Sequence, residues 1–121
     1  MNATRSPSTV AEAARALADG RLVLMPTETV YGLAADAGDA LAVAAVYEAK
    51  GRPSFNPLIA HVADVGMARR IAHFDDRAEA LAAAFWPGPL TLVLPVADER
   101  AVCGLARAGL GETVVRTFRT R

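Results

Sequence analysis

The chain is poor in lysine and cysteine and carries no net charge. Among its 121 residues, Cys103 is the only cysteine and Lys50 is the only lysine. A lone cysteine excludes a disulfide framework and a multi-cysteine metal site. Thirteen basic residues, nearly all of them arginines, balance thirteen acidic ones. No overall positive field therefore favours nucleic acid as a partner.

Long apolar runs are also missing. No uninterrupted apolar stretch reaches the roughly 18 residues that a membrane span needs, and residues 1–7 contain no signal-peptide core. We therefore expect a cytoplasmic protein with no membrane partner. The chain is still apolar enough to fold, since 53% of its residues are hydrophobic and 21% are charged. Its length predicts a single domain with a real core.

Predicted helices and strands alternate along the chain. Capping residues, apolar spacing and prolines predict four helices: between Thr9 and Gly20, over 40–50 after Asp39, from Asp64 to Ile71, and from an acidic capping box at Asp76 and Glu79 to Pro87. Strands are predicted over 22–26, 58–62, 90–96 and 113–117, and residues 27–32 are extended or looped. This alternation favours an α/β sheet with helices packed on it. The last strand is expected at an exposed edge of the sheet, where further chain should follow.

The densest polar cluster covers residues 50–57, with the sequence Lys-Gly-Arg-Pro-Ser-Phe-Asn-Pro. One interpretation is a helix C-terminus, where Lys50 complements the negative end of the helix, followed by a proline-rich turn. The other is an anion site. Lysine supplies a mobile charge, and Arg52 supplies a planar fork that matches phosphate or carboxylate. The spacing alone does not separate the two.

A second polar cluster, over 26–32, directly follows a predicted strand. Thr27 and Thr29 point to the same side of an extended segment. Their hydroxyls would suit a polar ligand, and Tyr31 would form a wall beside it. The strand end is a common place for ligands in α/β sheets. Ordinary β-propensity of threonine, valine and tyrosine explains the same residues without a ligand.

Two further side chains interrupt apolar strands. His61 has the position of a satisfied core histidine or of a ligand. Arg116 either pairs with an anion, because a buried arginine needs a partner, or lies on the solvent face of an edge strand. The chain contains no Ser-His-Asp order, phosphate-binding loop, zinc spacing or dinucleotide fingerprint.

Together, four motifs in order resemble the Sua5/YrdC/YciO family of L-threonylcarbamoyladenylate synthases. They are Pro-Thr-Glu-Thr-Val-Tyr-Gly-Leu over 26–33, Lys-Gly-Arg-Pro with Asn-Pro-Leu and His61 over 50–61, Phe-Trp-Pro-Gly-Pro-Leu-Thr-Leu over 85–92, and Thr-Val-Val-Arg over 113–116. The resemblance implies a YrdC-like twisted mixed sheet flanked by helices. Residues 1–121 would be the N-terminal portion of one such domain, with its C-terminal part missing. The family's Ser-Ala-Asn motif is absent, and residues 117–121 replace its proline and His-Pro pair.

The same resemblance implies an enzyme, a nucleotidyltransferase. It would join L-threonine, bicarbonate and ATP into threonylcarbamoyl-AMP, for the N6-threonylcarbamoyladenosine modification at position 37 of tRNA. By matching motifs, Thr29, Tyr31, His61 and Arg116 would bind L-threonine, while Lys50, Arg52 and Asn56 would contact ATP. Lys50 and Arg52 would be the catalytic cations. Mg²⁺ would neutralise the triphosphate, with no metal site made by the protein itself.

Two other interpretations remain open. In the first, the chain is an inactive, truncated remnant of the same fold. In the second, it is a module of that fold that binds double-stranded RNA or tRNA without catalysis. Zero net charge and few aromatic residues argue against the RNA-binding module. In the enzymatic interpretation, tRNA and the proteins of its modification machinery are the expected partners beyond the small substrates.

Overall fold

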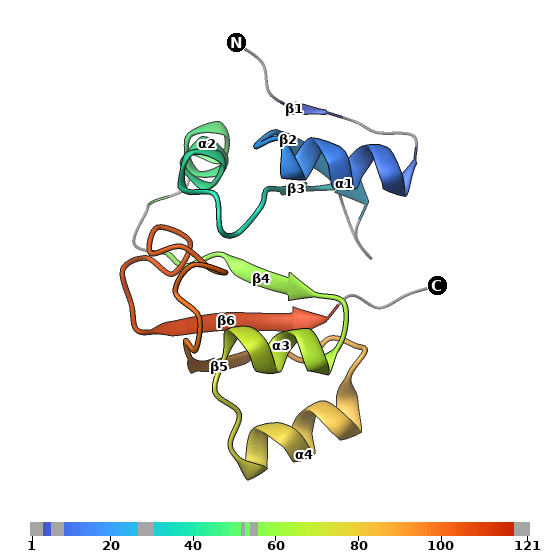
Figure 1. Cartoon of the computed structure of the whole chain (residues 1–121), viewed down its shortest axis with the longest axis vertical. Helices are drawn as coiled ribbons and strands as arrows, with labels where there is room; N and C mark the ends of the chain where they lie inside the picture. The colour runs from blue at the N-terminus through green and yellow to red at the C-terminus, as the bar shows by residue number, and fades with distance from the viewer. Residues whose placement is uncertain (1–3, 6–8, 27–30, 52, 54–55, 118–121) are drawn as a thin grey trace. The chain divides into compact units, whose positions relative to one another are not determined.

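The computed structural model describes residues 4–5, 9–26, 31–51, 53 and 56–117. The chain divides into two compact units, Met1–Pro53 and Ser54–Arg121, whose elements are drawn in Figure 1. Each unit has its own sheet and its own helices. The expected single domain over 1–121 stays a prediction.

The N-terminal unit is built around a short buried strand. Its elements are β1 (Thr4–Arg5), α1 (Val10–Ala18), β2 (Leu22–Pro26), β3 (Tyr31–Ala34) and α2 (Ala40–Lys50). β2 pairs in parallel with β1 and antiparallel with β3. Leu22 and Val23 are buried, whereas Leu24 is 39% exposed. The predicted strand over 22–26 is therefore confirmed, and β3 forms within and beyond the segment expected to be extended or looped.

The helices of this unit begin and end at the predicted capping residues. The Thr9 side chain accepts a hydrogen bond from the N–H of Glu12 at 3.0 Å. Asp39 Oδ1 accepts from the N–H groups of Leu41 and Ala42 at 3.1 and 3.2 Å. Gly51 ends α2 in the left-handed conformation, with φ at 60°. A side chain is strained there, which is why glycine suits this position.

The C-terminal unit places its last strand in the middle of a sheet. Its elements are β4 (Ile59–Val62), α3 (Val65–Ile71), α4 (Asp76–Phe85), β5 (Leu92–Pro95) and β6 (Glu112–Thr117). The described strands have the order β4-β6-β5. Val115 of β6 lies opposite Ala60 on one side and Leu92 on the other. The expectation that the last strand is an edge is therefore wrong, because β4 and β5 flank it.

This sheet has one buried face and one open face. α3 packs against β4 and β6. The side chains that alternate into the buried face are those of Ala60, Val62, Leu92, Leu94, Thr113, Val115 and Thr117. The intervening residues of each strand face the other way and are more exposed. That open face carries His61 of β4 and Arg116 of β6.

Two details of the helical layer follow from side-chain hydrogen bonds. α4 begins one residue earlier than its predicted capping box, because Asp75, not Asp76, accepts from the N–H of Ala78 at 2.8 Å. Arg69 of α3 forms an ion pair with Glu79 of α4, with Nη2 and Oε1 2.7 Å apart. This pair ties the two helices to each other.

The long connection between β5 and β6 is organised by a buried arginine. Arg107 is only 8% exposed. Its guanidinium donates to the carbonyl of Val102 at 3.0 Å and to that of Leu110. Buried carbonyl groups need such donors. The connection therefore reaches β6 in a fixed conformation.

Candidate functional site

His61 and Arg116 lie opposite each other on neighbouring parallel strands. The register of β4 and β6 pairs these two residues directly. Paired positions of adjacent strands project to the same face of a sheet, here the open face. His61 is exposed and Arg116 is half-buried. The structure thus brings together two of the residues predicted to bind one substrate.

The surroundings exclude two of the simpler interpretations. His61 is not a core histidine, because its side chain is on the open face. Arg116 is not on an edge strand, because β6 is central. Within the described part of the chain, no hydrogen bond or ion pair involves the Arg116 guanidinium.

An arginine and a histidine side by side can bind a small anion. The guanidinium offers two parallel N–H groups, which fit the two oxygens of a carboxylate. The imidazole adds a donor or an acceptor next to it. Both residues stand near the carboxyl ends of their strands, the region of α/β sheets where ligands usually bind. The pair therefore suits a ligand with a carboxylate and a second polar group.

The other predicted site residues are distributed differently. Asn56 belongs to the C-terminal unit and precedes β4. The chain just before β4 is held by a hydrogen bond that the N–H of Leu58 donates to the carbonyl of Ala106 at 2.9 Å. Lys50 is exposed in the last turn of α2, in the N-terminal unit. There it complements the negative end of the helix.

Three predicted residues are not fully placed. Thr29 and Arg52 lie outside the described residues. Tyr31 opens β3, with its backbone opposite Pro26. The assignment of Thr29 and Tyr31 to L-threonine, and of Lys50 and Arg52 to ATP, therefore stays a prediction.

Sequence reasoning missed an apolar row on the open face. Ile59, Val114 and Val93 lie opposite one another across β4, β6 and β5. Ile59 is 43% exposed and Val93 is 56% exposed. The two-residue alternation of a strand indicates which residues share this face, because Ile59 precedes His61 by two positions and Val114 precedes Arg116 by two. Strand order was needed to see that the three residues are neighbours.

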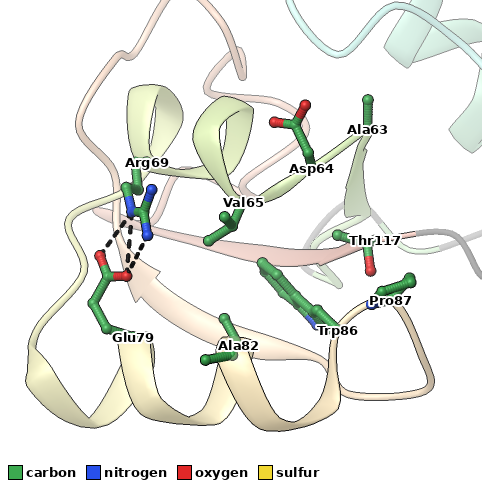
Figure 2. A pocket seen from close by; sticks show the side chains of 10 residues that line it. Ala63, Asp64, Val65, Arg69, Glu79, Ala82, Trp86, Pro87 and Thr117 are labelled. Carbon is green, nitrogen blue, oxygen red and sulfur yellow. Dashed lines mark hydrogen bonds and ion pairs between the residues drawn. The ribbon is translucent and has the colours of Figure 1, made fainter.

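A cavity of about 360 Å³ opens on the other side of the sheet. Figure 2 shows Arg69 and Glu79 at one end of it and Trp86 and Thr117 at the other. The Glu79 carboxylate, hydrogen-bonded to Arg69, raises the pKa of Arg69, and Arg69 lowers the pKa of Glu79. Thr117 follows Arg116 in β6, so its side chain points to the opposite face. The cavity is therefore separate from the His61–Arg116 pair.

A metal site built by the protein has no support in the part of the chain that the structure describes. No group of three or more histidine, cysteine, aspartate or glutamate side chains gathers there. In the same residues, no helix has both the length and the apolar character needed to cross a bilayer.

Comparison with protein families gives one match over most of the chain. Residues 15–118 match the family Sua5_yciO_yrdC, described as telomere recombination. Among curated proteins, the threonylcarbamoyl-AMP synthase of Pyrococcus abyssi is 49% identical over 105 residues, which cover 86% of this chain and 30% of that protein. The threonylcarbamoyl-AMP synthase of Bacillus subtilis is 44% identical over 108 residues, covering 88% and 31%. The chain thus spans about a third of the length of these relatives.

Solved structures show the same similarity. The crystal structure of P. abyssi Sua5 complexed with L-threonine superposes with a TM-score of 0.85 at 42% identity. The match covers 99% of this chain and 36% of that one. A second protein, MTH1692 of Methanobacterium thermoautotrophicum, gives a TM-score of 0.75 at 28% identity, covering 97% of this chain and 55% of its own.

Proposed function

Because the chain belongs to the Sua5/YciO/YrdC family, we propose that it takes part in the synthesis of threonylcarbamoyl-AMP from L-threonine, bicarbonate and ATP. Threonylcarbamoyl-AMP synthase is the name carried by its relatives. The chemistry is that of a nucleotidyltransferase, and its product would serve the threonylcarbamoyl modification of tRNA in the cytoplasm. Residues 1–121 would be the N-terminal portion of one YrdC-like domain.

The observation that carries the proposal is the pairing of His61 with Arg116 on the open face. Arg116 would hold the carboxylate of L-threonine through two parallel hydrogen bonds. His61, in the neighbouring strand, would hold the amino group or the hydroxyl. Held in this way, the amine is oriented towards the carbon of bicarbonate, and such positioning contributes to rate without a covalent nucleophile.

The remaining predicted residues complete the scheme. Thr29 and Tyr31 would line the L-threonine site. Lys50, Arg52 and Asn56 would contact ATP, the two cations stabilising negative charge as the carbamate oxygen attacks the α-phosphorus and pyrophosphate leaves. Mg²⁺ would be bound by the oxygens of the triphosphate. Released threonylcarbamoyl-AMP would then pass to the tRNA-modifying proteins.

Calorimetric titration of L-threonine into the chain tests the proposal. We expect binding to the wild-type chain and a loss of affinity of about tenfold or more in Arg116→Gln, because a hydrogen bond to a charged group contributes about 1.5–3 kcal/mol. Arg100→Gln is the matched control, since Arg100 is exposed in the connection between β5 and β6. Equal affinities in the two variants, or no binding by the wild type, would contradict the proposal.

A second measurement tests the reaction itself. Release of pyrophosphate from ATP should depend on both L-threonine and bicarbonate. Release that is independent of either one would exclude this reaction for the chain.

A further inference from the structure

The cavity on the helical side of the C-terminal sheet has no part in the function proposed above. Residues of α3, α4 and β6 line it, on the face of the sheet opposite His61 and Arg116. Its volume of about 360 Å³ falls at the lower end of the roughly 300–1,000 Å³ that small-molecule sites occupy. A cavity of this size admits a ligand of one or two rings.

One buried polar group in this cavity lacks a hydrogen-bond partner. Thr117 is only 3% exposed, and its Oγ1 makes no hydrogen bond to any of the described residues. Figure 2 shows this hydroxyl at the end of the cavity that Trp86 and Pro87 form. A buried hydroxyl without a partner costs free energy, which a hydrogen bond from a ligand would offset. Thr117 therefore marks where a polar group of a ligand would bind.

The indole ring of Trp86 provides a fixed, flat wall in the same part of the cavity. Its Nε1 donates to the carbonyl of Leu90 at 2.8 Å. The ring also packs edge-to-face with Phe74, with the two ring centroids 6.2 Å apart. The other apolar residues of the lining are Ala63, Val65, Ala82, Ala83 and Pro87. Such walls favour a planar, apolar ring.

The charges that line the cavity disfavour an anion. Both carboxylate oxygens of Glu79 accept hydrogen bonds from Arg69, so this ion pair is neutral as a whole. Asp64 adds a further carboxylate, whose Oδ1 accepts from the N–H of Met67 at 2.8 Å. The lining thus carries one negative charge in excess, which repels an anionic ligand.

We propose that this cavity binds a small, uncharged, planar ligand. The ring of the ligand lies against Trp86, and its hydroxyl or amide group forms a hydrogen bond with Thr117 Oγ1. Binding satisfies the buried hydroxyl and removes apolar surface of the lining from water. The site is separate from the proposed synthesis of threonylcarbamoyl-AMP, because it lies on the other face of the sheet.

Phenol is the simplest probe of this chemistry, because it joins one planar ring to one hydroxyl group. Benzene lacks the hydroxyl, and benzoate carries a negative charge instead. Trp86 is the only tryptophan of the chain, so its fluorescence reports directly on the cavity. Titrations of the full chain at neutral pH should show saturable binding of phenol. It should be about three- to tenfold tighter than that of benzene, the usual contribution of one neutral hydrogen bond. Benzoate should bind more weakly than benzene.

Two threonine variants isolate the hydrogen bond. Thr117→Val keeps the shape of the side chain but removes the hydroxyl, so it should bind phenol no more tightly than benzene. Thr113→Val is the matched control. Thr113 lies on the same strand and the same buried face, and its Oγ1 also lacks a partner among the described residues, but it is not part of the cavity lining. This variant should keep the preference for phenol, and thermal melts check that both variants fold.

Four results would overturn the proposal. The first is the absence of saturable binding by phenol. The second is a preference for phenol that survives in Thr117→Val or disappears equally in Thr113→Val. The third is binding of benzoate as tight as that of phenol, which contradicts the charge assigned to the ligand. Ala82→Leu supplies the fourth, because its larger side chain fills the cavity: binding of phenol that persists in the folded variant would place the probe elsewhere.

Discussion

At the scale of single residues, position on the sheet decides what each charged group can do. Arg116 and Arg107 are both close to β6, yet Arg116 faces the open side without a described partner, whereas Arg107 is buried and donates to two carbonyl groups. The sequence does not distinguish their roles, because both arginines have apolar neighbours along the chain. The family resemblance placed His61 and Arg116 at one ligand, but the residues alone could not show that the two are neighbours, since this depends on β4 pairing with β6 across the intervening helices.

Replacing Arg107 should destabilise the chain. Arg107→Met keeps much of the side-chain volume but leaves the carbonyl of Val102 without its donor in buried surroundings. An unsatisfied buried group costs about 1–3 kcal/mol. We expect a loss of that order in the free energy of unfolding, measured by urea denaturation. Arg100→Met is the exposed control, and equal losses in both variants would show that the buried hydrogen bonds contribute nothing.

The ion pair between Arg69 and Glu79 should make stability depend on pH. Arg69 lowers the pKa of Glu79 in the folded chain. A carboxylate with a lowered pKa stabilises the fold above its ordinary pKa, and this contribution disappears as the pH falls through the lowered value. Glu79→Gln should therefore be less stable than the wild type near neutral pH, and the difference should shrink as the pH falls through the acidic range and Glu79 takes up its proton. Urea denaturation over a series of acidic pH values measures this difference, and a gap that does not shrink as the pH falls would contradict it.

At the scale of elements, local signals predicted helices better than strands. The caps Thr9, Asp39 and Gly51 are confirmed, because capping depends on residues only two to four positions apart. The start of α4 was one residue wrong because Asp75 and Asp76 are chemically equivalent candidates. β1 was missed and β3 was only partly expected, since both are short and form by pairing with β2. The edge position assigned to the last strand failed for the same reason: strand order depends on contacts between distant segments.

Removing the cap of α2 should have a measurable cost. Asp39→Ala deletes the acceptor for the N–H groups of Leu41 and Ala42. We expect a loss of about 1 kcal/mol in the free energy of unfolding, measured by thermal or urea denaturation. Asp19→Ala is the comparison, because Asp19 caps the C-terminal end of α1 with its backbone, and a carboxylate there is unfavourable. An equal loss in both variants would refute the capping contribution.

At the scale of the whole molecule, the ordered motifs predicted the family and the fold correctly. The YrdC-like mixed α/β fold is confirmed by the superposition with Sua5. The division into two compact units was not predicted, because no linker composition marks the boundary after Pro53. Lys50 lies in the first of these units and Arg116 in the second.

Ligand-dependent stabilisation should separate nucleotide binding from threonine binding. A ligand at 100 times its Kd stabilises the folded state by about 2.7 kcal/mol. We expect both L-threonine and ATP to raise the melting temperature of the wild-type chain. In Lys50→Gln the effect of ATP should weaken while that of L-threonine remains, and the threonine response serves as the internal control. An unchanged response to ATP would remove Lys50 from the nucleotide site.

The place of β6 in its sheet also bears on how the protein forms during synthesis. β4 and β5 leave the ribosome before the strand that joins them, and β6 is their shared neighbour. Until residues 112–117 have emerged, each of these strands presents an unsatisfied backbone edge to its surroundings. Because their pairing spans a long stretch of sequence, closure of the sheet is slow compared with helix formation. We therefore expect the nascent chain to be most open to non-native strand pairing just before residues 112–117 emerge.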